Sequence, residues 1–129
     1  MLTQQPLILV VDDESDSLAY LFDLLHNEGY RVIPTSSPLD ALELAAKRKP
    51  GLIISDLRMP DLDGMELLDR VKEISPKSRV ILLTAYGDRD IDQDVIRRGG
   101  DAMLLKPSSN DEILKTVRKA LEEVERCSP

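Results

Sequence analysis

Aspartates follow two of the short aliphatic runs in this sequence. Asp12 and Asp13 come directly after residues 7–11, and Asp56 comes directly after residues 52–55. Carboxylates gathered at one place oppose each other's ionisation unless a cation offsets the repulsion. Oxygen ligands without histidine suit Mg²⁺, which keeps several waters and shares its coordination shell with phosphate oxygens. If the fold brings the three groups together, the sequence predicts a Mg²⁺ site.

Two other aliphatic runs are also followed by polar residues that could take part in a reaction. Thr84 follows residues 80–83 and Lys106 follows residues 102–105. A lysine ammonium holds a phosphoryl oxygen as a point charge, and a threonine hydroxyl donates a hydrogen bond. A carboxylate nucleophile, a metal, an ammonium and a hydroxyl together are what aspartyl-phosphate chemistry requires.

The elements that must position these residues follow from the hydrophobic pattern. Short apolar runs alternate with amphipathic stretches, which is typical of βα units on a parallel sheet buried on both faces. The fold class is therefore α/β, a single doubly wound, five-stranded parallel sheet. The expected strands are residues 7–11, 31–35, 52–55, 80–83 and 102–105.

The second strand carries Arg31 and Pro34, which places it at an edge of the sheet. With right-handed crossovers the strand order becomes 2-1-3-4-5. Strands one and three then lie side by side where the order reverses, and ligands of open α/β sheets bind beyond the carboxyl ends of the strands at that point. Asp12, Asp13 and Asp56 are expected to meet there.

Helices are indicated by apolar residues at three- and four-residue steps. Ser37 before Pro38 is typical of an N-cap, and Ser109 or Asn110 is expected to cap the last helix. The fourth helix, after Gly87, carries several aspartates, and we expect it to be the least stable element. The apolar positions are Leu18, Leu21, Phe22 and Leu25; Leu39, Leu42 and Ala46; Leu67, Val71 and Ile74; Ile91, Val95 and Ile96; and Ile113, Val117, Leu121 and Val124.

Length and composition bound the other possibilities. The 129 residues fit one domain, 1–129, with residues 1–6 and 126–129 expected to be frayed ends. A net charge of −7 argues against nucleic-acid binding, and no apolar run is long enough to span a membrane. The single cysteine, Cys127, is consistent with a reducing compartment, so a cytoplasmic location is expected.

Four runs carry a family resemblance: ILVVDDE at 8–14, SDLRMPDLDGMEL at 55–67, LTA at 83–85 and LKP at 105–107. In this order and at these intervals they resemble the receiver domains of response regulators in two-component signalling, which have a flavodoxin-like (βα)5 fold. The resemblance implies that Asp56 is the phosphoacceptor. It also implies that Asp12 and Asp13, with Asp56 and the backbone carbonyl of Arg58, hold Mg²⁺.

Further roles are implied by the same resemblance. Lys106 would contact the phosphoryl group and Thr84 would move toward it. The donor would be a phosphohistidine of a sensor histidine kinase or histidine phosphotransfer domain, or a small acyl phosphate. The domain would catalyse only its own phosphorylation and dephosphorylation. It would alter the surface of the helix after Gly87, strand 102–105 and the helix after Asn110, which would control an output domain or partner or form a homodimer.

Some positions modulate this expectation. Met103 stands where many receivers carry a Tyr or Phe that turns inward, and Ser108 stands where many have Phe. Tyr86 and Arg58 occupy positions that tune dephosphorylation in the family, and a bulky Tyr86 would shield the acyl phosphate from water. Pro107 would follow a cis peptide bond.

Plainer interpretations stand beside these. Taken singly, each aspartate is an ordinary solvated loop charge, Lys106 a surface lysine and Thr84 a helix cap. His26 is an exposed helix residue, and Met59, Met65 and Met103 are packing residues. Three rival functions remain: an aspartyl phosphatase, a flavodoxin-like electron carrier, and a receiver that serves only as a docking module. Against the first, the residue two positions after Asp12 is Glu14 rather than an aspartate.

Overall fold

The computed structural model describes residues 6–85, 89–106 and 108–127, with the side chains of residues 89, 90 and 123–127 outside that description. Five strands alternate with five helices along the chain. The strands are β1 (Leu7–Val11), β2 (Arg31–Thr35), β3 (Leu52–Ser55), β4 (Arg79–Thr84) and β5 (Ala102–Leu105). The helices are α1 (Ser15–Asn27), α2 (Pro38–Arg48), α3 (Gly64–Ile74), α4 (Arg89–Arg97) and α5 (Asn110–Cys127). No helix in these ranges is both long and apolar enough to cross a membrane.

The strands form one parallel sheet in the order β2-β1-β3-β4-β5. This confirms the predicted topology, including the placement of β2, with Arg31 and Pro34, at an edge. In the register of the central pair, Val11 lies opposite Ser55, so β1 and β3 end at the same level. The residues that follow these two strands are therefore neighbours.

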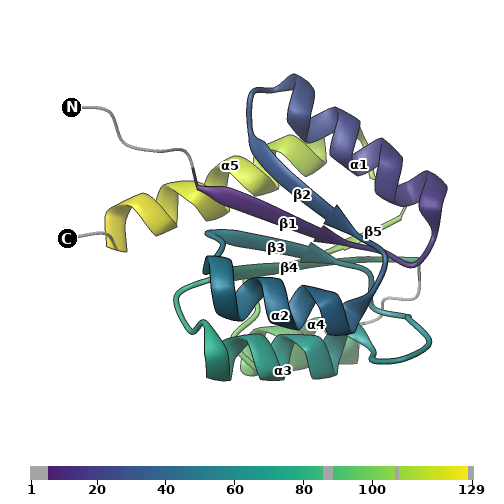
Figure 1. Cartoon of the computed structure of the whole chain (residues 1–129), viewed down its shortest axis with the longest axis vertical. Coiled ribbons are helices and arrows are strands. Elements are labelled where there is room, and N and C mark those ends of the chain that lie inside the picture. Colours follow the sequence, from purple (N-terminus) through teal and green to yellow (C-terminus); the bar gives the residue numbers. More distant parts are fainter. Residues whose placement is uncertain (1–5, 86–88, 107, 128–129) are drawn as a thin grey trace.

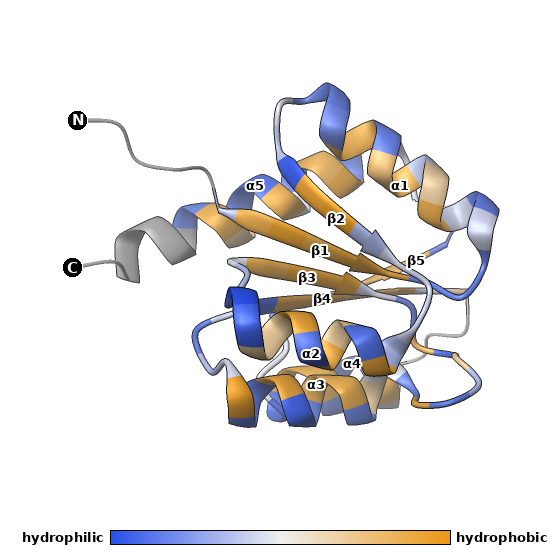
Figure 2. Cartoon of the chain, in the orientation of Figure 1, coloured by the Kyte–Doolittle hydropathy of each residue, from blue (hydrophilic) through white to orange (hydrophobic). Residues whose placement is uncertain are grey.

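Helices cover both faces of the sheet, α1 and α5 on one and α2, α3 and α4 on the other (Figure 1). Alternate strand residues pack into two separate cores because successive side chains of a strand point to opposite faces. In β1, Leu9 and Val11 face α2, α3 and α4, whereas Ile8 and Val10 face α1 and α5. The strand ribbons are mostly apolar, although β2 begins with the polar Arg31, and the helices carry polar residues away from the sheet (Figure 2).

The predicted helix starts are confirmed at two positions. The Ser37 hydroxyl accepts a hydrogen bond from the Asp40 backbone N–H at 3.2 Å, with Pro38 in the first helical position. At α5, the Ser109 hydroxyl accepts from the Glu112 N–H at 3.1 Å, so Ser109 rather than Asn110 is the cap. Such caps satisfy amides that have no partner within the helix.

Two sequence predictions differ from the structure. Thr84 is the last residue of β4 rather than the residue after it, because it pairs with Leu105 of β5. Ile96 is 55% exposed instead of buried, since it lies one position past Val95 and points away from the face shared by Ile91 and Val95. Helix α5 continues to Cys127; the frayed ends expected at residues 1–6 and 126–129 stay a prediction.

Helix α4 is attached to the rest of the fold through Val95, through Ile91 packed against the same core, and through Arg98 just past its end. Val95 is fully buried, and it is the one buried residue among the α4 side chains that are described. The Arg98 guanidinium, just past the helix, lies 3.1 Å from the Asp69 carboxylate of α3 and 3.2 Å from that of Asp94. The low stability expected for α4 stays a prediction.

Shortening Val95 to alanine should therefore lower the free energy of unfolding by about 2 kcal/mol, because two buried methyl groups are lost and a cavity remains. Ile96→Ala, one residue away and exposed, is the matched control and should change it by less than about 0.5 kcal/mol. Urea unfolding followed by circular dichroism measures both values. Equal losses in the two variants would contradict the assigned facing of α4.

Candidate functional site

Three carboxylates meet at the carboxyl edge of the sheet. One oxygen from each of Asp12, Asp13 and Asp56 lies within 4.8 Å of the others. Asp12 and Asp13 follow β1, and Asp56 follows β3, so the reversal of strand order brings them together as predicted. Among the described residues this is the only group of three or more potential metal-ligating side chains.

Backbone hydrogen bonds of the parallel-sheet type continue one residue beyond the strands and hold Asp12, Asp56 and Lys106 in place. The Asp12 N–H donates to the Thr35 carbonyl at 3.2 Å, and the Asp56 N–H donates to the Val11 carbonyl at 3.0 Å. On the far side, the Lys106 N–H donates to the Thr84 carbonyl at 2.8 Å. The side chains thus leave the sheet from positions that the strands define.

Asp12 and Asp13 differ sharply in their surroundings. Asp12 is 1% exposed, and its Oδ1 accepts a hydrogen bond from the Glu14 N–H at 2.9 Å. Asp13 is exposed. Adjacent residues therefore supply one carboxylate fixed in the protein and one that faces solvent.

The Lys106 ammonium lies over two of the three carboxylates. Its Nζ is 3.1 Å from Oδ2 of Asp12 and 3.8 Å from Oδ2 of Asp56. A buried carboxylate needs a partner of opposite charge, and Lys106 supplies it for Asp12. The same ammonium is within reach of any oxygen attached to Asp56.

Asp56 is the carboxylate whose ionisation is opposed. Burial raises the pKa of Asp56 above its ordinary value of 3.8. The Lys106 ammonium opposes this shift, the neighbouring Asp12 adds to it, and hydrogen bonds from the Leu57 and Arg58 backbone amides lower the pKa. A cation beside Asp56 would stabilise its charged, nucleophilic form.

The remaining predicted site residues are placed as follows. Thr84 is fully buried at the end of β4, and Met103 in β5 is half-buried and packs against the core. The Arg58 side chain is exposed. Tyr86 and Pro107 lie outside the described residues.

Three other residues have the packing or surface roles that the plainer interpretation predicts. Met59 is buried, and Met65 packs against the same core. His26 is exposed and stacks on Phe22, with ring centroids 5.2 Å apart. None of these three lies in the acidic cluster.

One residue of the site was missed by sequence reasoning. Gly64, the first residue of α3, lies against the Asp56 backbone: a Cβ placed on it would come within 2.6 Å of the Asp56 carbonyl oxygen. Its N–H donates to the Leu57 carbonyl at 2.8 Å and closes the loop between β3 and α3. A glycine directly after an aspartate N-cap is the available signal, but the spacing alone does not reveal the contact.

The donor set fits Mg²⁺. Three carboxylate oxygens within 4.8 Å of one another, with one group open to solvent, suit a hard cation that retains water. Such an ion would screen the repulsion among the three charges.

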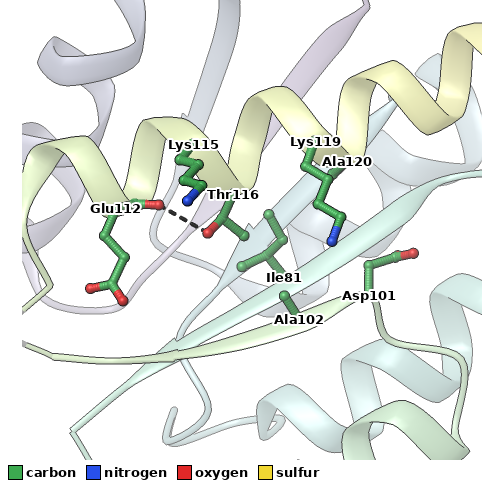
Figure 3. A pocket seen from close by; sticks show the side chains of 8 residues that line it. All are labelled: Ile81, Asp101, Ala102, Glu112, Lys115, Thr116, Lys119 and Ala120. Atoms are coloured by element: carbon green, nitrogen blue, oxygen red, sulfur yellow. Dashed lines mark hydrogen bonds between the residues drawn. The ribbon is translucent and has the colours of Figure 1, made fainter.

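A separate groove of about 430 Å³ lies between α5 and the adjoining edge of the sheet, away from the carboxylates (Figure 3). Ile81, Ala102 and Ala120 give it an apolar floor, and its charged residues are of both signs. The charged residues of the groove are Asp101, Glu112, Lys115 and Lys119.

Residues 8–118 match the family described as "Response regulator receiver domain". The chain belongs to the response regulator receiver domains. It is 37% identical over 114 residues to "Sporulation initiation phosphotransferase F" of Bacillus subtilis (strain 168), a match that covers 88% of this chain and 92% of that protein. It is 35% identical over 114 residues to "Transcriptional regulatory protein ZraR" of Klebsiella oxytoca; that match covers 88% of this chain but only 26% of the longer protein.

Solved structures agree with this membership. A CheY-like response regulator receiver domain protein from Methanospirillum hungatei JF-1 gives a TM-score of 0.92 at 26% identity, covering 97% of this receiver domain and all of that chain (100%). The beryllofluoride-activated NtrC4 receiver domain dimer gives 0.86 at 35% identity, over 92% and 98% of the two chains. Receiver domains are phosphorylation-controlled regulatory modules that bind Mg²⁺ at an acidic pocket, and this receiver domain has the acidic cluster.

The raised pKa of Asp56 has a consequence for stability. Above that pKa the folded chain holds an unfavourable charge, so stability is lost as pH rises through it. Asp56→Asn should raise the unfolding midpoint at pH 7 in EDTA, and the gain should vanish below pH 3.8, where both folded and unfolded Asp56 are protonated. Asp61→Asn, an exposed carboxylate of the same loop, should leave the midpoint unchanged.

Thermal unfolding by circular dichroism, in EDTA and in Mg²⁺, measures these effects. Mg²⁺ at a hundredfold excess over its Kd should stabilise the native chain by about 2.7 kcal/mol, and Asp56→Asn by less. A lower midpoint for Asp56→Asn in EDTA would contradict the electrostatic assignment.

Proposed function

We propose that this receiver domain accepts a phosphoryl group on Asp56 from a phosphohistidine, with Mg²⁺ held by Asp12, Asp13, Asp56 and the backbone carbonyl of Arg58. The observation that carries the proposal is the convergence of three carboxylates within 4.8 Å, two of them beside the Lys106 ammonium. The donor would be a sensor histidine kinase or a histidine phosphotransfer domain, which receiver domains of this family use. In this proposal the chain acts in the cytoplasm.

The residues would share the chemical work. A carboxylate oxygen of Asp56 forms a bond to phosphorus while the phosphorus–nitrogen bond of the phosphohistidine breaks, and the imidazole nitrogen keeps the electron pair and later takes up a proton. Bound Mg²⁺ would neutralise phosphoryl charge during this transfer. The Lys106 ammonium, 3.8 Å from Asp56, is near enough to hold a phosphoryl oxygen.

The output would be a shift between two conformations. Phosphorylation converts the Asp56 carboxylate, with one negative charge, into an acyl phosphate whose phosphoryl oxygens carry roughly two. The Thr84 hydroxyl and the Lys106 ammonium would contact them better in one conformation, which is what moves such an equilibrium. Thr84 ends β4 and pairs with Leu105, so its movement would reach the surface of α4, β5 and α5. Met103, Tyr86 and Pro107 would modulate this response.

Phosphoryl transfer is tested by incubating the chain with Mg²⁺ and acetyl phosphate and measuring its intact mass. The native chain should gain the mass of one phosphoryl group, and the gain should be lost in EDTA and in Asp56→Asn, because the nucleophile or its counter-charge is then missing. Asp61→Asn is the control and should be modified like the native chain. An equal gain in Asp56→Asn would place the acceptor elsewhere.

The same face is proposed to bind a partner, which is either an output domain or a second copy. Ile96 at the end of α4 is 55% exposed and Leu105 of β5 is 53% exposed, so apolar area is available there. The groove beside α5 offers charges of both signs, which suits a symmetric interface in which each side supplies both.

A homodimer through this face should form when beryllofluoride and Mg²⁺ stabilise the activated state. Size-exclusion chromatography with light scattering should then give twice the monomer mass for the native chain. Ile96→Asp should remain monomeric while still gaining a phosphoryl group, because the substitution lies outside the acidic cluster. A dimer that persists in Ile96→Asp would contradict this interface.

A further inference from the structure

The first residue of α3 lies in unusually close contact with the backbone of the proposed phosphoacceptor. A Cβ on Gly64 would be 2.6 Å from the carbonyl oxygen of Asp56 and 2.9 Å from the Cα of Leu57. Both are backbone atoms, which do not rotate out of the way as a side chain would. The φ angle of Gly64 is not positive, so the position requires the space that glycine leaves rather than its conformational freedom.

The Asp56 backbone is also held from its other sides. The Ser55 hydroxyl donates to the Asp56 carbonyl at 2.9 Å, and the Asp56 N–H donates to Val11 of β1 at 3.0 Å. Close-packed interiors transmit a displacement instead of absorbing it. A methyl group at position 64 would therefore move either the start of α3 or the peptide units that follow Asp56.

The loop that begins at Asp56 presents the site, and its apolar residues anchor it. Leu57, Met59 and Leu62 are each no more than 8% exposed and pack into the core beneath the loop. The backbone of Leu57 and Arg58 hydrogen-bonds the Asp56 carboxylate. The peptide units next to Gly64 are thus the ones that orient the carboxylate and the Arg58 carbonyl.

We infer that Gly64 is a positioning residue for the Mg²⁺ and phosphoryl site, acting through its side-chain-free contact with the Asp56 and Leu57 backbone. This inference rests on the proposed function. If Gly64 served only to begin α3, Gly64→Ala would not be expected to disturb the site. Alanine is a better helix former than glycine, and the Asp63 cap, which accepts from the Glu66 N–H at 2.9 Å, would still be present.

The test compares Gly64→Ala with Gly100→Ala. A Cβ on Gly100 would also clash, at 2.5 Å from Val95 Cγ1 and 3.0 Å from the Val95 carbonyl oxygen. Gly100 precedes β5 and so lies at the amino-terminal ends of the strands, whereas the carboxylates lie at their carboxyl ends. In both variants the added methyl group clashes with its surroundings, but only position 64 adjoins the site.

Mg²⁺ affinity of the folded chains is measured by calorimetric titration, alongside urea unfolding and the rate of phosphoryl gain from acetyl phosphate. Gly64→Ala should bind Mg²⁺ roughly tenfold more weakly, as is typical when residues supporting metal ligands are changed. Gly100→Ala should lose stability but keep the native Mg²⁺ affinity. Native affinity and phosphorylation rate in a folded Gly64→Ala would overturn the inference.

A second variant covers the case in which Gly64→Ala does not fold. Ser55→Ala removes the hydroxyl that holds the same Asp56 carbonyl and adds no volume, so it should also weaken Mg²⁺ binding. Unchanged Mg²⁺ affinity in Ser55→Ala would then overturn the inference. Failure of the native chain itself to bind Mg²⁺ or gain a phosphoryl group would instead overturn the proposed function, so the two failures are distinguishable.

Discussion

Repulsion among three carboxylates is the constraint on which this domain is organised. Asp12, Asp13 and Asp56 are close enough to share one ion, and the charge of Asp56 is opposed both by burial and by Asp12. One lysine lies over two of them, so the cluster keeps an excess of negative charge. Receiver domains bind Mg²⁺ at such an acidic pocket, and a divalent cation there would offset the repulsion among the three charges.

A few elements of the fold bring the three carboxylates together. The reversal of strand order sets β1 beside β3, and single hydrogen bonds beyond the strand ends fix Asp12 and Asp56. The sheet separates two apolar cores, one with α1 and α5 and the other with α2, α3 and α4. Thr84 ends β4 and Lys106 follows β5, so both lie at the end of the sheet where the carboxylates meet. Leu105 of β5 and Ile96 of the adjoining helix α4 are exposed.

Much of this arrangement could be predicted from sequence because it follows from local patterns. Unbroken aliphatic runs located four of the five strands within their observed bounds, and the proline of β2 placed that strand at an edge. The position of Asp12, Asp13 and Asp56 after those strands was then sufficient to bring them together. The roles of Lys106, Thr84 and the Arg58 carbonyl stay predictions.

Other features depend on packing that a local pattern does not contain. The different burial of Asp12 and Asp13 arises from Lys106, 94 residues away, and from the turn at Glu14. The exposure of Ile96 depends on the facing of α4 toward the sheet. The Arg98 link to Asp69 and the contact of Gly64 with Asp56 both join separate elements, so hydrophobic periodicity gives no sign of them.

Asp12 and Asp13 differ in exposure, so in the described part of the chain the acidic cluster is open to solvent on the side of Asp13. Lys106 and the turn at Glu14 close off Asp12, whereas Asp13 faces solvent. If Asp56 is the phosphoacceptor, as proposed, a donor protein would reach it from the side of Asp13, and hydrolytic water would have the same route. The rate of phosphorylation and the lifetime of the phosphoryl group would then both depend on this opening, and a partner that covers it would alter both.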